Sequence, residues 1–330
     1  MPENPILAII QEAPVFLNLA ASTEKAITCI RRAAADGAQI VTFAECWLPG
    51  YPAWVDFAPE AALWDHKGAK ALYRILSENS VVMGDTYLGA LQTLADELDI
   101  YIVMGTHERA GNTLYNTSFT FTPGAAAPAP HRKLVPTYTE RLLWGRGDGS
   151  TFVAADTPWG KLGNLICWEH WMPLARAAMH SLDEAIHVAQ WPIVRDMHQV
   201  ASRHYAFEGR CAVAAAGSVL TKGDMLEGLL SLNQKDPEAL ALLQSMPGER
   251  GSFIHNGGSA IIAADGSYLA EPLYEKSGTI TAEINMAHQR EEAMALDTNG
   301  HYSRPDIFEL SVNTSPQPGV RFKEDKPTIL

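Results

Sequence analysis

The sequence predicts an α/β fold in which mixed β-sheets are covered by helices. Short apolar runs typical of buried strands alternate with longer segments whose apolar residues recur at helical spacing. Towards the C-terminus two strand-like runs flank a turn dipeptide, as in hairpins, so the pattern is neither purely βαβ nor purely hairpin. Hydrophobic residues make up 47% and charged residues 19% of the chain, which is typical of a globular protein with a large core.

The N-terminal part predicts strand, helix and strand in that order. Residues 6–11 are a short apolar run and read as a first strand. A helix is then expected to begin with Ser22 as its N-cap and to end at Ala35, where Asp36 and Gly37 stop it. Residues 40–43 are continuously apolar apart from a threonine, which predicts a buried strand.

The middle and the end of the chain add further elements. Residues 88–99 carry a helical apolar pattern, residues 101–105 read as a strand, and residues 113–121 alternate like a strand with one polar face. The runs 258–263 and 278–284 lie on either side of Asp265-Gly266, a dipeptide that tolerates the positive φ of a tight turn.

The segment 224–250 is expected to be additional helical structure. It contains Leu226, Leu229, Leu230, Leu240, Leu242 and Leu243 among charged residues. A lid, a subunit contact and a surface insertion all fit this pattern. No Gly/Ser linker divides the chain, so residues 1–330 are expected to form a single domain with a short polar, proline-rich tail at about 313–330.

Charge and hydropathy exclude several classes of protein. The formal net charge is −13, whereas a nucleic-acid-binding surface requires a basic stripe. No apolar run reaches membrane-spanning length, and the first residues lack the pattern of a signal peptide. The four cysteines form no CxxC pair, which favours a reducing, cytoplasmic location.

Three chemical groups stand where strands are expected to end. Cys167 follows the apolar run 164–166 and precedes a segment that can start a helix, Glu45 ends the run that begins at Val41, and Lys133 comes just after a Pro/Ala-rich connection. A thiol, a carboxylate and an amine from separate strand ends are the groups that nucleophilic acyl-type catalysis needs. The pattern therefore indicates a cysteine-dependent hydrolase of carbon–nitrogen bonds.

The chemistry of such a site can be stated from the groups alone. A free thiol has a pKa of about 8.5 and needs a base or a cation nearby to react at neutral pH. A carboxylate whose own pKa is raised in a dry site can be that base, and a lysine can stabilise the charge that develops on the substrate. Taken singly, each residue is more simply explained as an inert buried cysteine, a polar strand end or a surface lysine.

Other motifs lack the residue spacing that their usual functions require. The glycine-rich stretch 145–149 lacks the spacing of a phosphate-binding loop, and no GxSxG elbow is present. His198 and His204 lie at the ends of an expected helix without metal-ligand spacing. No metal or organic cofactor is implied.

The three local sequences together resemble the catalytic motifs of the nitrilase superfamily of carbon–nitrogen hydrolases. Phe43-Ala44-Glu45, His131-Arg132-Lys133-Leu134 and Leu165-Ile166-Cys167-Trp168-Glu169 occur in the superfamily's order. The similarity continues in residues 112–117, 136–149, 204–211 and 300–308, so that it runs from Ile6 to about Val312. Residues 136–149 and the His-Tyr-Ser-Arg-Pro-Asp segment at 301–306 resemble the true nitrilase branch.

The resemblance implies a fold, an assembly and a reaction. The fold is an α-β-β-α four-layer sandwich, and two copies pack helices together in a homodimer, which in nitrilases extends into spirals or longer filaments. The substrate is an organic nitrile, converted to the carboxylic acid and ammonia. An amidase or other C–N hydrolase of the same superfamily is the alternative, and a non-catalytic assembly or binding protein is a remote one.

The resemblance also implies roles for individual residues. Cys167 attacks the nitrile carbon to give a thioimidate, Glu45 is the general base, and Lys133 stabilises the tetrahedral intermediate. Glu140 is the fourth polar residue and holds Lys133. The substrate-binding residues are expected to be aromatic, with the backbone N–H of Trp168 as an oxyanion donor; they are Tyr51, Trp144, Trp168 and Trp191.

Overall fold

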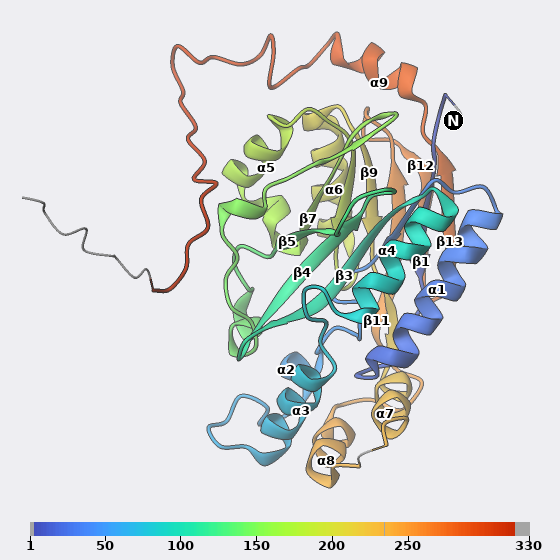
Figure 1. Ribbon diagram of the computed structural model, residues 1–330, viewed down its shortest axis with the longest axis vertical. Helices are drawn as coiled ribbons and strands as arrows, with labels where there is room; N and C mark the ends of the chain where they lie inside the picture. Colours follow the sequence, from blue (N-terminus) through green and yellow to red (C-terminus); the bar gives the residue numbers. More distant parts are fainter. Residues whose placement is uncertain (1–2, 234, 321–330) are drawn as a thin grey trace, which may run out of the picture.

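Two β-sheets pack face to face between two pairs of helices in the computed structural model of the protein, which describes residues 3–233 and 235–320 (Figure 1). The first sheet has the order β13-β1-β2-β3-β4-β5. Its strands are β1 (Ile6–Gln11), β2 (Ile40–Phe43), β3 (Tyr101–Ala110), β4 (Thr113–Phe121), β5 (Ala129–Arg132) and β13 (Gly278–Glu283). The neighbours β1, β2 and β3 are parallel, and the other pairs are antiparallel.

The second sheet has the order β10-β11-β9-β8-β7-β6, and β12 pairs with β11 outside this path. Its strands are β6 (Ala155–Thr157), β7 (Gly160–Ile166), β8 (Glu184–Gln190), β9 (Ala212–Ala216), β10 (Val219–Thr221), β11 (Phe253–Ile262) and β12 (Tyr268–Tyr274). Here β7, β8 and β9 are parallel. Each sheet therefore has a parallel centre, which has to be covered on both faces.

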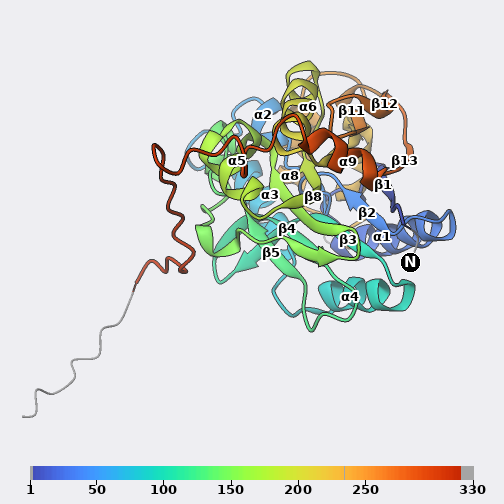
Figure 2. The ribbon, with the colours of Figure 1, turned by 90° about the horizontal axis from the view of Figure 1, so that it is seen from above.

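Apolar side chains fill the spaces between the layers. Ile9 and Val103 of the first sheet meet Val188 and Ala214 of the second in the central core. On the outside of the first sheet lie α1 (Leu19–Ala35) and α4 (Thr86–Leu98), and on the outside of the second lie α5 (Pro173–His180) and α6 (Asp196–Gly209) (Figure 2). The expected α-β-β-α four-layer sandwich is confirmed.

Four further helices gather at one end of the sheets (Figure 1). They are α2 (Trp54–Phe57), α3 (Lys67–Glu78), α7 (Lys222–Leu230) and α8 (Pro237–Ser245). The segment 224–250 thus contains most of α7 and all of α8, which agrees with the expected helical structure. Leu226 and Leu242 are buried in one apolar cluster with Leu72 of α3 and with Tyr51, so the segment packs as part of the folded core.

The C-terminal part leaves the sandwich after β13. Helix α9 (Met286–Ala293) is followed by an extended chain that crosses the surface past α5 (Figure 1). The backbone N–H of Gln317 donates to a carboxylate oxygen of Asp148 at 2.7 Å. Of the tail expected at 313–330, residues 321–330 lie outside the described residues. No helix in the described ranges is long and apolar enough to cross a membrane.

Three local expectations need correction. Helix α1 begins at Leu19 because Asn18 caps it, accepting from the N–H of Ala21 at 3.1 Å, whereas the hydroxyl of Ser22 donates to the carbonyl of Val15 at 2.9 Å. The polar side chains of β4 are mostly buried. The Asp265-Gly266 turn leads directly into β12, a half-exposed strand that contains Pro272 and therefore gives a weak sequence signal.

Candidate active site

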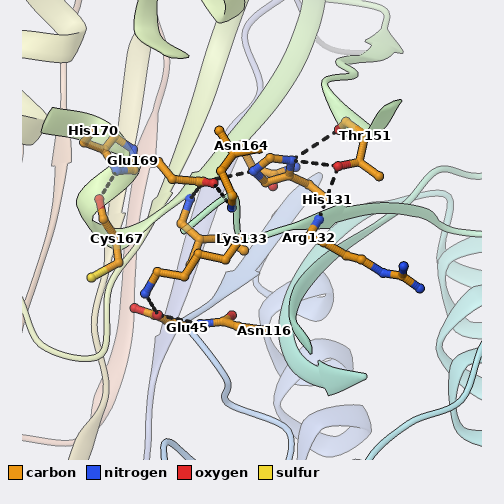
Figure 3. A network of polar contacts seen from close by, with 12 residues as sticks. Glu45, Asn116, His131, Arg132, Lys133, Thr151, Asn164, Cys167, Glu169 and His170 are labelled. Carbon is orange, nitrogen blue, oxygen red and sulfur yellow. Dashed lines mark hydrogen bonds and ion pairs between the residues drawn. The ribbon is translucent and has the colours of Figure 1, made fainter. Parts of the chain in front are cut away.

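The three predicted catalytic groups meet where strands of both sheets end. Glu45 lies two residues beyond β2, Lys133 directly follows β5 and Cys167 directly follows β7. The two sheets are joined at this point by the N–H of Glu45, which donates to the carbonyl of Trp191 at 3.2 Å. Figure 3 shows the Lys133 amine pointing at the carboxylate of Glu45, with the Cys167 sulfur close to both.

Lys133 lies between two carboxylates. Its Nζ donates to Oε1 of Glu45 at 2.7 Å and to Oε2 and Oε1 of Glu140 at 2.7 and 3.0 Å. The Cys167 sulfur and one carboxylate oxygen from each glutamate lie within 4.8 Å of one another. All four side chains are buried. The sequence-predicted residues Glu45, Lys133, Glu140 and Cys167 therefore form one cluster.

Burial sets the protonation of this cluster. It raises the pKa of Glu45 to about 7, assisted by the charge of Glu140 and opposed by Lys133 and Asn116. It also raises the pKa of the Cys167 thiol well above its ordinary value, and the neighbouring Glu45 adds to this. For Lys133, burial opposes the charge but is outweighed by Cys167, Glu45 and Glu140, so its pKa rises. The resting nucleophile is thus a thiol beside a carboxylate that can take its proton.

The backbone at Cys167 is unusual. Its φ is 55°, in the left-handed region, at the junction between β7 and the 3₁₀ helix η3 (Cys167–Trp171). A non-glycine residue in this region costs on the order of 1 kcal/mol, which the surrounding contacts must offset. The carbonyl of Cys167 accepts a hydrogen bond from Nδ1 of His170 at 2.7 Å. This sharp turn presents the sulfur at the end of the strand.

Glu140 is held from several sides. It lies in the 3₁₀ helix η1 (Tyr138–Leu142), and its Oε2 accepts from the N–H of Thr137 at 2.6 Å. The hydroxyl of Tyr51 donates to its Oε1 at 2.8 Å. The carboxylate is therefore fixed against Lys133 by a short local turn and by a distant aromatic residue.

Sequence reasoning missed two residues that order the cluster. Asn116 of β4 donates from Nδ2 to Oε1 of Glu45 at 2.7 Å. Glu169 accepts from the N–H of Leu134 at 2.7 Å and from the N–H of Ile166 at 2.6 Å, and so ties the residue after Lys133 to the residue before Cys167 (Figure 3). Both residues stand in motifs noted in the sequence, but Glu45 lies 71 residues from Asn116 and Leu134 lies 35 residues from Glu169.

Glu169 also pairs with a buried histidine. Nε2 of His131 donates to Oε2 of Glu169 at 2.9 Å, and Nδ1 faces the carbonyl of Thr151 at 3.2 Å. Burial opposes the charge of His131, but Glu169 raises its pKa; the pKa of Glu169 is in turn lowered by His131 against the effect of burial. With hydrogen-bond acceptors at both ring nitrogens, His131 is a cation paired with the Glu169 anion.

A cavity of about 320 Å³ opens onto Cys167 and Glu140. Tyr51 and Trp168, two of the four aromatic residues expected to bind substrate, line it. Charged and titratable side chains line it as well, namely Asp56, Arg195, His198 and His255. A second, more open cavity of about 690 Å³ shares Trp168, Arg195 and His198 with the first, so the two are continuous along this wall.

Trp144 and Trp191 lie behind the cavity wall, which corrects their expected place on it. Trp191 is fully buried, and its Nε1 donates to the hydroxyl of Ser202 at 3.1 Å. Trp144 donates to Nδ1 of His107 at 3.1 Å and packs edge-on against Tyr51. Their closeness to the motifs in sequence does not determine which face of the chain they occupy.

Comparisons with known proteins agree with this architecture. The family model described as carbon-nitrogen hydrolase matches residues 6–292. An aliphatic nitrilase of Sinorhizobium fredii (strain HH103) is 36% identical over 95% of this chain and 97% of its own length. A nitrilase of Pseudomonas syringae pv. syringae (strain B728a) is 34% identical over 99% of this chain and 95% of its own length.

A solved structure shows the same fold. The crystal structure of Saccharomyces cerevisiae Nit3, a member of branch 10 of the nitrilase superfamily, superposes with a TM-score of 0.65 at 17% identity, covering 91% of this chain and 96% of that one. Together with the family model and the sequence relatives, this establishes that the chain is a C–N hydrolase enzyme. It belongs to the carbon–nitrogen hydrolase family and, within that family, to the nitrilase branch.

Proposed function

We propose that this enzyme hydrolyses an organic nitrile, with two molecules of water, to the carboxylic acid and ammonia. The sequence relatives of this chain are nitrilases along nearly its whole length. The observation that carries the proposal is the buried cluster in which Lys133 joins Glu45 and Glu140 beside the Cys167 thiol at the end of a cavity.

The first step joins Cys167 to the substrate. Glu45 takes the thiol proton, the sulfur adds to the nitrile carbon, and the proton passes to the nitrile nitrogen, which gives a neutral thioimidate. Oε2 of Glu45 has no hydrogen-bond partner within the described residues and belongs to the carboxylate beside the thiol, so it can accept this proton. Lys133 and the N–H of Trp168 stabilise the negative charge that develops on nitrogen.

Two additions of water complete the reaction. Glu45 activates the first water, which adds to the thioimidate carbon, and loss of ammonia leaves a thioester. A second water releases the carboxylic acid and restores the thiol. Lys133 supports both tetrahedral intermediates, and Glu140 keeps its amine in place through two hydrogen bonds.

The cavity walls bear on the choice of nitrile. The aromatic faces of Tyr51 and Trp168 provide apolar surface for an alkyl or aryl substituent. Asp56 and Arg195 add charge on the same walls, so the substituent can also carry a polar group.

The test is ammonia release and product mass from matched nitriles and amides, with Cys167→Ala as the blank. Acid formed from nitriles, with little turnover of the amides, is expected. Turnover of amides alone would overturn the proposal and identify an amidase, because the same four residues can serve a carbonyl carbon.

We also propose a homodimer in which α5 and α6 of two copies pack together, and a cytoplasmic location. On the outer faces of these helices Leu174, Val200 and Phe207 are exposed apolar residues that a second copy would cover. The four cysteines are free thiols, which fits a reducing compartment. Sedimentation of the wild type and of Val200→Lys tests the dimer: the variant is expected to sediment as a monomer, and an unchanged dimer would refute this interface.

A further inference from the structure

A chain of buried hydrogen bonds leads from the carbonyl of Cys167 into the second sheet. Nδ1 of His170 contacts this carbonyl at 2.7 Å, and its Nε2 lies 3.0 Å from Nε2 of His187 on β8. Nδ1 of His187 lies 2.8 Å from Glu184, which also accepts from the hydroxyl of Tyr205 on α6 at 2.5 Å. All five residues are buried, and the proposed reaction uses only the first of them.

The direction of each hydrogen bond in this chain is determined by its ends. The carbonyl of Cys167 can only accept, so Nδ1 of His170 carries a hydrogen. Burial and the neighbouring His187 lower the pKa of His170 well below its ordinary value, so the ring is neutral and its Nε2 is an acceptor. Nε2 of His187 must therefore donate to it.

The other end of the chain supplies the charge that this arrangement needs. Burial opposes ionisation of Glu184, but His187 and Tyr205 outweigh it and lower the pKa of Glu184, so it is a carboxylate. Nδ1 of His187 then donates to Glu184 while Nε2 donates to His170. By donating to Nε2 of His170, His187 keeps that nitrogen an acceptor and the hydrogen of His170 on Nδ1.

The orientation of the Cys167 carbonyl matters because its peptide bond is shared with Trp168. A trans peptide is planar, so its carbonyl and its N–H point in opposite directions. By holding the oxygen, His170 directs the N–H of Trp168 the other way. His170 itself is held by Trp191, whose ring lies 4.9 Å from it at 32°.

We infer that His170 and His187 are positioning residues that aim the N–H of Trp168 at the charge developing on the substrate, with His187 acting only by fixing the tautomer of His170. The inference rests on the proposed function, since it takes Cys167 as the nucleophile. Neither histidine transfers a proton in the reaction, because every ring nitrogen already has a partner.

A double-mutant cycle on His170→Asn and His187→Asn tests this inference. The amide introduced by His170→Asn can still donate to the carbonyl of Cys167 and has no tautomer to be fixed, and the amide introduced by His187→Asn can still donate to Glu184. We expect His187→Asn alone to lower kcat about tenfold, the loss of roughly one hydrogen bond, with KM unchanged. In the background of His170→Asn, the same substitution is expected to change kcat less than about twofold.

Equal losses from His187→Asn in both backgrounds would overturn the inference, because they would show a role independent of His170. An unchanged kcat in His187→Asn would overturn it too. His288 of α9, a surface histidine that lies near Asp265 and Glu291, provides a matched control, and His288→Asn is expected to leave kcat unaltered. If His187→Asn does not fold, His170→Phe and His170→Asn replace it: only the phenylalanine should lose activity, and equal losses would refute the idea.

Alkylation of Cys167 by iodoacetamide distinguishes two roles of the His170–His187–Glu184 hydrogen bonds: orienting the N–H of Trp168 and holding the sulfur of Cys167. This reaction displaces iodide and develops no oxyanion, so it does not use the N–H of Trp168. We expect the alkylation rate of folded His187→Asn to stay within about twofold of the wild type while kcat falls. A parallel fall would show that the network holds the sulfur instead, against the inference.

Failure of the proposed function gives a different result. A wild-type enzyme that turns over amides and not nitriles refutes the nitrilase proposal, and the cycle is then measured with an amide. A wild type active on nitriles whose cycle is additive refutes only the positioning role.

Discussion

Glu45 is a buried carboxylate that must accept a proton from the Cys167 thiol in the proposed reaction. Its pKa of about 7 lies above the ordinary value because burial disfavours the charge and Glu140 lies nearby. The basic form grows as pH rises through this value. The reaction therefore depends on one carboxylate whose charge is balanced close to neutral pH.

The pH profile of kcat/KM tests this property. We expect an acid limb with its midpoint near 7, falling about tenfold per pH unit below it. Asn116→Ala removes a donor that favours the ionised form, so the limb should move to higher pH. Asn164→Ala, which removes a buried contact to Thr120 instead, should leave the midpoint in place. A limb unmoved in Asn116→Ala would contradict this account.

Lys133 is the only cation that touches both glutamates in the described part of the chain. Lys133→Ala is expected to be inactive and to lose about 3–5 kcal/mol of unfolding free energy, because two buried carboxylates would remain unpaired. Urea denaturation measures this loss. Lys161→Ala, at an exposed lysine paired with Asp156, should change the unfolding free energy by less than about 1 kcal/mol. A folded, fully active Lys133→Ala would remove the lysine from the mechanism.

Arg195 is an exposed cation on the wall shared by both cavities, and its guanidinium has no hydrogen bond or ion pair within the described ranges. A nitrile with a distant carboxylate can supply that partner. Arg195→Gln should lower kcat/KM for such a nitrile about fivefold and leave its neutral amide analogue unchanged, since exposed ion pairs contribute about 1 kcal/mol or less. Equal losses of kcat/KM for both compounds would show that Arg195 does not recognise the charge of the substrate.

For individual residues, the sequence predicted which side chains take part in the chemistry better than it predicted which residues contact them. Cys167, Glu45, Lys133 and Glu140 stand in motifs, and the structure brings them together. The contacts of Asn116 could not be predicted, because its partner Glu45 lies 71 residues away and no local pattern links the two. The burial of Trp191 could not be predicted either, because its neighbours in sequence do not show which face of the chain it occupies.

The elements around the site explain how separate strand ends reach one point. Glu169 accepts backbone N–H groups from beyond β5 and from the end of β7, and His131 at the end of β5 neutralises it. A single side chain thereby holds the segments that carry Lys133 and Cys167 at a fixed separation. Such a link between the two sheets is required because their core contacts are apolar and non-directional.

Glu169→Gln tests this link between elements. The amide leaves the His131 cation without its anion, so we expect a loss of about 3–5 kcal/mol in unfolding free energy together with lower kcat. Adding His131→Gln removes the unpaired charge and should restore part of the stability. Urea unfolding of the two single variants and the double variant gives the coupling. Additive losses would mean that the two side chains act independently.

The sequence predicted elements well where pattern and burial agree. Strands β1 and β2 match their apolar runs, and Asp99, in the left-handed conformation, ends α4 where the helical pattern stops. Strand β9 is different, because its sequence, AVAAA, has a low intrinsic preference for the strand conformation. It forms a strand because it lies between β8 and β11 in the sheet. Tertiary context of this kind has no local signal.

On the scale of the whole molecule, the parallel centres of the two sheets face one another across a single core. That core takes residues from β1 and β3 on one side and from β8 and β9 on the other. Strand β13 comes from the far end of the chain and pairs with β1, so the first sheet cannot be completed before the second has been synthesised. We propose on this basis that the chain folds as one domain.

Hydrogen exchange with increasing urea tests this proposal, using Ile186→Ala as a perturbation. Ile186 lies on β8, is 1% exposed and packs in the central core. Its truncation should cost about 2–5 kcal/mol. If the sheets form one cooperative unit, amides of β2 and β3 should lose protection at the same lowered urea concentration as those of β8. Protection that falls in β8 and stays at its wild-type midpoint in β2 and β3 would divide the chain into two domains, because the damage would then stop at the surface between the sheets.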